Sequence, residues 1–245
     1  MARLTKNAKR VLRRAISAGG RAVLGVTPGF VRRWAAPYAP YADMLFGDHL
    51  VIRVAFPNRH RLSAEAWRAA QPLPHQIMDL ARRGIRTVIN LRGVSASSTY
   101  LLEKQACEKA GLTMLDFRVR SRGVPTRSEV LEARALFDRV EYPILMHCKS
   151  GSDRAGLMSA LYLHVRCGVP IAIAKKQLAL RYGHIRQADT GVLDAFFERY
   201  LEDSERQPMP FFEWVETVYD PDELKQTFHA SGWANRIVNG LLKRE

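Results

Sequence analysis

The sequence predicts an α/β domain in which helices flank a central, mostly parallel sheet of four to five strands. Segments rich in apolar and β-branched residues alternate with segments of helical spacing, which is the pattern of a parallel sheet. Hydrophobic residues make up 47% and charged residues 25% of the 245 residues, an ordinary balance for a globular protein. A chain of this length can also bury a large core without disulfides or metal ions.

Each predicted element has its own signal in the sequence. Short apolar runs bounded by Gly, Pro or polar residues predict strands at 49–56, 67–70, 86–91, 112–119 and 144–146. Helical spacing predicts helices at 73–83, 99–110, 126–140 and 154–165. Gly84 and Gly111 end the first two helices, and Thr126 with Glu129 forms a capping box for the third.

The chain divides into three segments. These are a basic N-terminal arm at 1–47, the α/β domain at 48–205 and a helical C-terminal extension at 206–245. The formal net charge is +14, and nine Lys and Arg residues precede the first acidic residue, Asp43. The excess positive charge is therefore concentrated in the arm.

Three interpretations of the arm stay open: a solvated tail, a segment that contacts an anionic membrane, and a nucleic-acid contact. Nucleic acid is the least favoured, because no helix-turn-helix, zinc or RNP-like pattern accompanies the charge. Apolar residues at helical spacing between the cations, followed by aromatic residues, favour the membrane. No apolar stretch is long enough to span a bilayer. We expect a cytoplasmic protein, with a peripheral position on the inner membrane face as the alternative.

The three cysteines, Cys107, Cys148 and Cys167, are too few and too widely spaced for a disulfide framework, which fits a reducing compartment. Neither CxxC nor HExxH spacing occurs. We therefore expect no metal ion and no other cofactor. Cys107 is expected to be packed, and Cys167, which follows the long helix, is expected to be structural.

The chemistry of the chain is concentrated in the HCKSGSDRAG segment, 147–156, which follows a short strand and opens a helix. Cys148 has His147 beside it, Arg154 six positions on and a helix N-terminus behind it, surroundings that favour a thiolate. Arg154 offers a planar fork to two phosphoryl oxygens. The loop amides can close around a tetrahedral anion, with binding positions expected at Lys149, Ser150, Gly151, Ser152 and Ala155.

This strand-His-Cys-x5-Arg-x-Gly-helix pattern resembles the cysteine-dependent protein tyrosine and dual-specificity phosphatase superfamily, in the form of its bacterial dual-specificity-like members. The resemblance covers about residues 64–200. WRAAQP at 67–72 and GIRTVINLRG at 84–93 are similar to the strand that enters that fold and to its second strand. The resemblance implies hydrolysis of phosphate monoesters through a phosphocysteine on Cys148. Many relatives carry Ser or Thr where Ala155 stands, which implies slow hydrolysis of that intermediate.

The sequence does not indicate one residue as the general acid as clearly as it indicates the nucleophile. Relatives often use an Asp on the loop after the preceding strand, and residues 118–125 contain none. Asp153 next to Arg154 resembles the loop of myotubularin-type lipid phosphatases and is the preferred candidate. Asp116 is the alternative, together with a leaving group that needs no acid. An ion pair with a neighbouring Arg is the non-catalytic interpretation of Asp153.

Several cations inform the choice of substrate. Lys149 after the nucleophile resembles tensin-type and mitochondrial phospholipid phosphatases. Four arginines are expected near the mouth of the site: Arg118, Arg120, Arg122 and Arg127. Together with the arm, they favour a membrane-resident lipid phosphate such as a phospholipid, a phosphoinositide or a lipid A-type molecule. A phosphatase for phosphoproteins and a catalytically silent phosphate-binding adaptor are the alternatives.

Three further features receive a minor role. Some relatives use a second cysteine, which implies a protective disulfide between Cys107 and Cys148 as the alternative to a packed Cys107. His184, directly after the helix-ending Gly183, can orient water or phosphate, although a helix-terminus residue is the simpler interpretation. The C-terminal aromatic residues are expected to pack in the core, with a membrane or partner surface as the alternative: Phe211, Phe212, Trp214, Tyr219 and Trp233.

Overall fold

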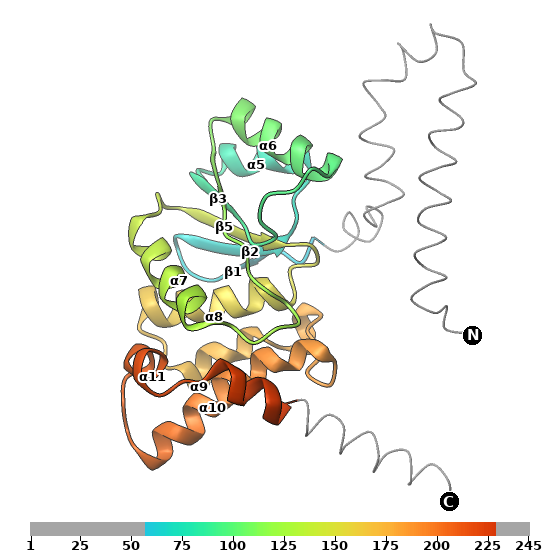
Figure 1. The fold of residues 1–245 in the computed structure, drawn as a ribbon. Coiled ribbons are helices and arrows are strands. Elements are labelled where there is room, and N and C mark those ends of the chain that lie inside the picture. The colour runs from blue at the N-terminus through green and yellow to red at the C-terminus, as the bar shows by residue number, and fades with distance from the viewer. Residues whose placement is uncertain (1–56, 229–245) are drawn as a thin grey trace, which may run out of the picture.

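The computed structural model describes residues 57–228, which form a five-stranded sheet covered by helices (Figure 1). The strand order is β1-β2-β5-β3-β4, and only the β1–β2 pair is antiparallel. The strands are β1 (His60–Arg61), β2 (Ala66–Ala70), β3 (Thr87–Asn90), β4 (Thr113–Asp116) and β5 (Ile144–Cys148). The predicted fold class is confirmed. The predicted strand at 49–56 and the arm at 1–47 lie outside the described residues.

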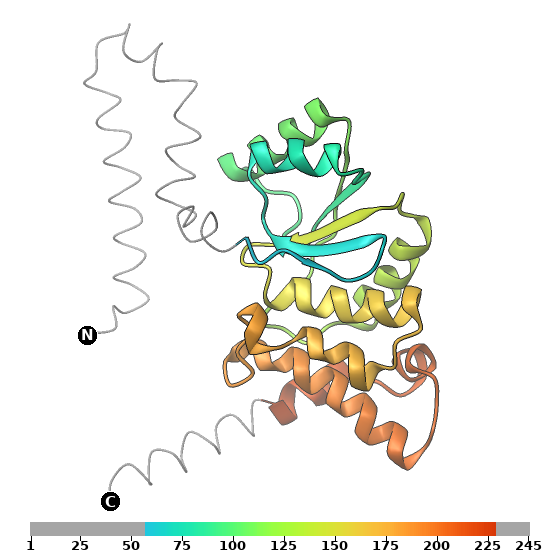
Figure 2. The same ribbon diagram turned by 180° about the vertical axis from the view of Figure 1, so that it is seen from behind.

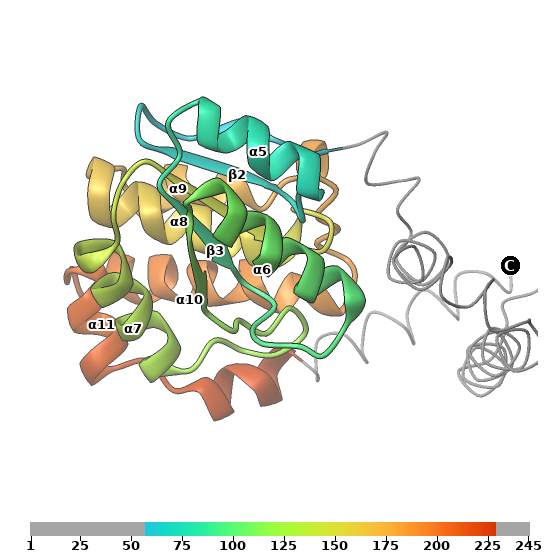
Figure 3. The same ribbon diagram turned by 90° about the horizontal axis from the view of Figure 1, so that it is seen from above.

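Helices cover both faces of the sheet. One face carries α5 (Pro74–Arg82) and α6 (Ser98–Ala110), and the other carries α7 (Arg127–Arg139) and α8 (Asp153–Cys167). Figure 3 shows α5 and α6 lying side by side over the strands. Strand β5 alternates between the two cores: Leu145 packs with α5 and α6, whereas Met146 and Cys148 join the core of α7 and α8.

A third layer of helices packs on α8 (Figures 1 and 2). It contains α9 (Ile171–Ala174), α10 (Val192–Arg206) and α11 (Phe211–Thr217), joined by the 3-10 turns η2 (Lys175–Gln177), η3 (Leu180–Tyr182) and η4 (Asp189–Gly191). Phe211, Trp214 and Tyr219 are buried around Phe196 of α10. These three aromatic residues therefore pack in the core, as expected, whereas Trp233 lies outside the described residues.

Two predicted strands end two or more residues away from where the structure ends them, and the sequence did not predict the short strand β1. Strand β4 ends at Asp116 rather than 119, and Arg118 beyond it packs against the turn at Gly93. Strand β5 continues two residues further than predicted, to Cys148. The predicted capping box of α7 is confirmed, with Thr126 and Glu129 bonded to each other's backbone. No helix within 57–228 is long and apolar enough to cross a bilayer.

Candidate active site

Cys148 is the last residue of β5, a strand with neighbours on both sides. It is paired with Ala70 at the end of β2, and the preceding His147 is paired with Asn90 at the end of β3. The carboxyl ends of three parallel strands therefore meet at this cysteine, which is where α/β sheets bind ligands. Its thiol is free, and the residue is 2% exposed at the base of the loop that follows.

The loop between β5 and α8 passes very close to β2. Gly151 has a φ of +74°, and a Cβ at this position would lie 2.6 Å from the backbone N of Ala70. Backbone atoms cannot move aside as a flexible side chain can, so any residue other than glycine would push the loop off the sheet. The close approach of the two backbones therefore requires glycine at position 151.

All four loop carbonyls accept hydrogen bonds from outside the loop. The donors lie on either side of or within β2: Gln71 N–H to Lys149 O (3.4 Å), Asn58 Nδ2 to Ser150 O (2.8 Å), and Arg68 Nη2 to Gly151 O (2.6 Å) and Ser152 O (3.0 Å). In a trans peptide the N–H points away from the carbonyl. Within residues 57–228, no acceptor is recorded for the amides of Ser150, Gly151 and Ser152. Those donors are available to an anion.

Arg154 closes the other end of the loop, in the first turn of α8. Its side chain is half-buried and makes no hydrogen bond or ion pair with any residue in the described part of the chain; its Nε is buried without a partner. A buried, unpaired guanidinium is costly unless an anion satisfies it. The helix N-terminus adds further positive potential at the same place.

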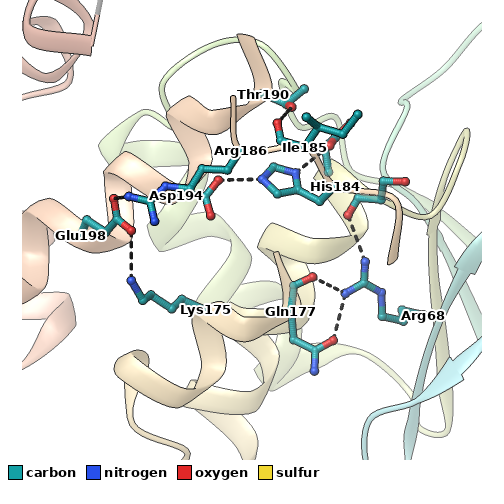
Figure 4. Close-up of polar contacts among 11 residues, drawn as sticks. Arg68, Lys175, Gln177, His184, Ile185, Arg186, Thr190, Asp194 and Glu198 are labelled. Carbon is teal, nitrogen blue, oxygen red and sulfur yellow. Dashed lines mark hydrogen bonds and ion pairs between the residues drawn. The ribbon is translucent and has the colours of Figure 1, made fainter. Parts of the chain in front are cut away.

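Asp153 belongs to a charged chain of three residues on α8, the segment after η3, and α10. His184 lies between two carboxylates. Its Nδ1 is 2.8 Å from Asp153 Oδ1. Its Nε2 is 2.6 Å from Asp194 Oδ2, a contact drawn in Figure 4. Burial opposes a charged imidazole, but the hydrogen bonds to Asp153 and Asp194 outweigh it and raise the pKa of His184 to about 9. The structure thus gives His184 a stronger connection to the loop than the sequence suggested. Asp194 was not predicted.

Asp116, the alternative acid, lies at the end of β4. Its Oδ1 accepts from Asn90 Nδ2 and its Oδ2 from the Tyr100 hydroxyl, both at 2.7 Å. The Asp116 hydrogen bond is the largest cause of the raised pKa of Tyr100, which reaches about 12. Both carboxylate oxygens are therefore occupied as acceptors.

His147 belongs to a buried polar chain on the opposite side of the cysteine. Its Nε2 lies 2.6 Å from Glu103 Oε1 on α6, and both side chains are almost fully buried. Glu103 Oε2 accepts from Gln71 Nε2 at 2.6 Å, and Gln71 Oε1 in turn accepts from Arg92. This chain fixes the residue next to the nucleophile. The sequence gave no signal for it, because its members come from four separate segments.

The remaining predicted site residues lie in different surroundings. Lys149 is half-buried and Ser150 is exposed, whereas Ser152 is buried, with its hydroxyl facing Gly183. Ala155 lies in the core with no exposed surface. Cys107 packs in the α5–α6 core, on the other face of the sheet from Cys148, and burial raises its pKa to about 12.

One expectation about the arginines is wrong. Arg127 donates to the carbonyls of Glu216 and Tyr219, so it holds the chain after α11 in place rather than facing the site mouth. Arg118, Arg120 and Arg122 all lie beyond the end of strand β4 at Asp116. Arg120 lies 3.6 Å from Glu129 of α7.

Residues 57–192 match the family model described as a DSP-PTPase phosphatase fused to NAD+ kinase. The chain belongs to this family. It is a cysteine-dependent phosphatase of the protein tyrosine and dual-specificity phosphatase superfamily, as the sequence predicted. No curated protein matches the chain. No three His, Cys, Asp or Glu side chains between 57 and 228 gather as a metal site would require.

Several solved structures are similar to the chain. P. aeruginosa TpbA has a TM-score of 0.47 at 20% identity, covering 69% of this chain and 89% of TpbA. PTPMT1 has a TM-score of 0.45 at 23% identity, covering 61% of this chain and 99% of PTPMT1. TpbA has also been solved in complex with pTyr, and PTPMT1 in complex with PI(5)P.

We predict that His184 makes the stability of the phosphatase depend on pH. The folded state binds the imidazole proton more tightly than the unfolded state does, since the pKa rises from 6.5 to about 9. This stabilisation, roughly 2 to 3 kcal/mol, is complete below pH 6.5 and is lost as pH rises through 9. Urea unfolding at several pH values should show the fall, and His184→Gln should remove it. Equal pH slopes for both proteins would contradict the prediction.

Proposed function

We propose that the phosphatase hydrolyses phosphate monoesters through a phosphocysteine on Cys148, and that its favoured substrate is an anionic lipid phosphate at a membrane surface. The observation that supports this reaction is the orientation of the backbone groups of the loop 149–152, together with an Arg154 that is unpaired among the described residues. Four carbonyls are turned outward, and Arg154 has no partner in the described part of the chain. Such a loop has a surplus of donors facing one small volume, which suits a tetrahedral dianion.

The reaction proceeds in two displacements. The Cys148 thiolate attacks phosphorus, the bond to the ester oxygen breaks, and that oxygen leaves as an alcohol after taking a proton. Water then attacks phosphorus, the phosphorus–sulfur bond breaks, and inorganic phosphate and the thiolate are released. Arg154 and the loop amides hold the phosphoryl oxygens through both steps. No cofactor takes part.

Asp153 supplies the proton in this proposal. Its Oδ1 is bonded to His184, whereas no partner is recorded for Oδ2 within residues 57–228, so this oxygen can face the ester. Protonated His184 is the source of this proton: one proton passes from its Nδ1 to the Asp153 carboxylate, and the carboxylic acid so formed gives that proton to the leaving oxygen, which leaves His184 neutral and Asp153 ionised. The raised pKa of His184 keeps that source loaded at neutral pH.

The surface beside the loop supports a membrane substrate. Leu180 and Ile185 are 78% and 52% exposed, and they line a pocket of about 370 Å³ that also contains the cations Lys176 and Arg186 and the acids Asp194 and Glu198. Exposed apolar side chains among cations are typical of surfaces that contact anionic lipid. The same segment adjoins the loop, because Asn58 donates to both Ser150 O and Tyr182 O. The basic arm, outside the described residues, precedes Asn58 in the chain.

The first test concerns the nucleophile. The protein should release p-nitrophenol from p-nitrophenyl phosphate, and Cys148→Ser should lower kcat by about 10⁴-fold or more, since an alcohol is a far weaker nucleophile here. Acid quenching followed by mass spectrometry should find phosphate on Cys148. Tungstate binding without any turnover of p-nitrophenyl phosphate or lipid would indicate an adaptor and refute the enzyme mechanism.

The second test concerns the acid. Asp153→Asn should lower kcat about 100-fold for an alkyl phosphate but only a few-fold for p-nitrophenyl phosphate, whose leaving group departs without a proton. His184→Asn should show the same dependence on the leaving group, and Asp116→Asn should not. Equal losses on both substrates would exclude Asp153 as the proton donor.

The third test concerns the membrane. In Leu180→Ser/Ile185→Ser, kcat/KM for a phosphoinositide in phosphatidylcholine vesicles should fall about tenfold or more, because each apolar side chain contributes roughly 1 to 2 kcal/mol of burial. Activity on p-nitrophenyl phosphate should not change. Val218→Ser, which alters a side chain that is 45% exposed just after α11, is the matched control. Unchanged vesicle activity in the double variant, or preferential turnover of phosphopeptides, would favour a protein substrate.

A further inference from the structure

Arg68 is a buried cation in the middle of β2, within the WRAAQP segment, and has no exposed surface. Figure 4 shows its guanidinium held between two parts of the chain. Nη1 donates to Gln177 O (2.7 Å) and Oε1 (2.9 Å), and Nη2 donates to Gly151 O (2.6 Å) and Ser152 O (3.0 Å). The Tyr182 ring covers it, with its centroid 4.1 Å from Cζ.

The two loop contacts fix two successive peptide planes. The Gly151 carbonyl shares a plane with the Ser152 amide, and the Ser152 carbonyl shares one with the Asp153 amide. One nitrogen of Arg68 attracts both oxygens, so both N–H groups must point away from it. Ser152 O also accepts the Gly156 amide at 2.9 Å, which ties the same plane to the first turn of α8.

The charge of Arg68 is retained despite its burial. Burial lowers its pKa to about 10, while the nearby Tyr182, Cys148 and Asp153 oppose that change. The side chain therefore remains a cation at neutral pH. A buried arginine that bonds only to carbonyls is costly to fold, which makes a purely structural role a poor explanation of its presence. A side chain without donors at this position would leave three acceptors without a recorded donor among the described residues, namely Gln177 O, Gln177 Oε1 and Gly151 O.

We propose that Arg68 is the positioning residue of the phosphate loop: it turns the carbonyls of Gly151 and Ser152 outward and so directs the amides of Ser152 and Asp153 toward the bound anion. It does not touch the substrate. The proposal rests on the proposed function in that the anion is the phosphoryl group of the substrate. It is separable from that function, because the orientation of the amides is read by oxyanion binding without turnover.

Tungstate, a tetrahedral oxyanion, is the probe, and its Kd is measured by calorimetry in a Cys148→Ser background. Arg68→Lys keeps a cation, but its single nitrogen must serve both the Gln177 side and the loop carbonyls. The Kd of this variant for tungstate should therefore rise about tenfold. Arg68→Met should raise it about 100-fold. In the protein with Cys148 intact, both substitutions should lower kcat/KM for p-nitrophenyl phosphate by similar factors.

Gln177→Ala is the matched control, since it removes an acceptor of the same guanidinium on the side away from the loop. It should keep the tungstate Kd within about twofold of the parent while lowering the melting temperature as Arg68→Lys does. The proposal is overturned if Arg68→Lys binds tungstate as tightly as its parent, or if Gln177→Ala weakens binding equally. Arg68→Lys and Gln177→Ala decide the matter even if Arg68→Met does not fold.

The two proposals fail in different ways. If the protein hydrolyses no phosphate ester but tungstate binding still depends on Arg68, the proposed function is wrong and the positioning role stands. If Cys148 is essential for turnover but Arg68→Lys retains full activity and affinity, the positioning role is wrong and the function stands.

Discussion

The site depends on one close approach, that of the loop 149–152 to the end of β2. At Gly151 the two backbones are so near that no Cβ fits between them. At that distance, donors on and around β2 reach all four loop carbonyls, which no longer point into the loop. The amides then face the opposite side together. A residue that pushed the loop outward would break these contacts at once and leave the amides without a common direction.

Charge is distributed around this loop in an uneven way. Protonated His184 lies between the carboxylates of Asp153 and Asp194, so these charges have partners. Arg154 has none among the described residues. At Arg154 the fold therefore carries part of the desolvation cost of a half-buried guanidinium, and a bound phosphoryl group offsets that cost. Part of the free energy of anion binding therefore comes from relieving a cost that the free protein already carries.

The sequence predicted the parts of the site whose residues are close together in the chain, and it did not indicate contacts between residues that are far apart in the chain. Strand, loop, glycine and arginine lie within eleven residues, 144–154, and their spacing alone indicated an anion-binding loop. The residues that orient this loop are far from it in sequence: Arg68 precedes Gly151 by 83 positions, and His184 follows Asp153 by 31. Arg127 was expected at the mouth of the site because of its position in the sequence. Its actual partners lie around 216–219, and no nearby motif indicates them. Only packing brings such residues together.

The segment 180–185 connects the inner and outer sides of the site. Tyr182 and His184 face inward, where one covers Arg68 and the other holds Asp153. Leu180 and Ile185 face solvent. Because these side chains share one short stretch of backbone, an outer surface that binds lipid would also restrict the two inner residues that support the loop. In a substrate anchored in a membrane, binding at the surface and ordering of the phosphate loop would then be favoured by the same contact. A soluble phosphoprotein would bring the phosphoryl group to the same loop without that contribution.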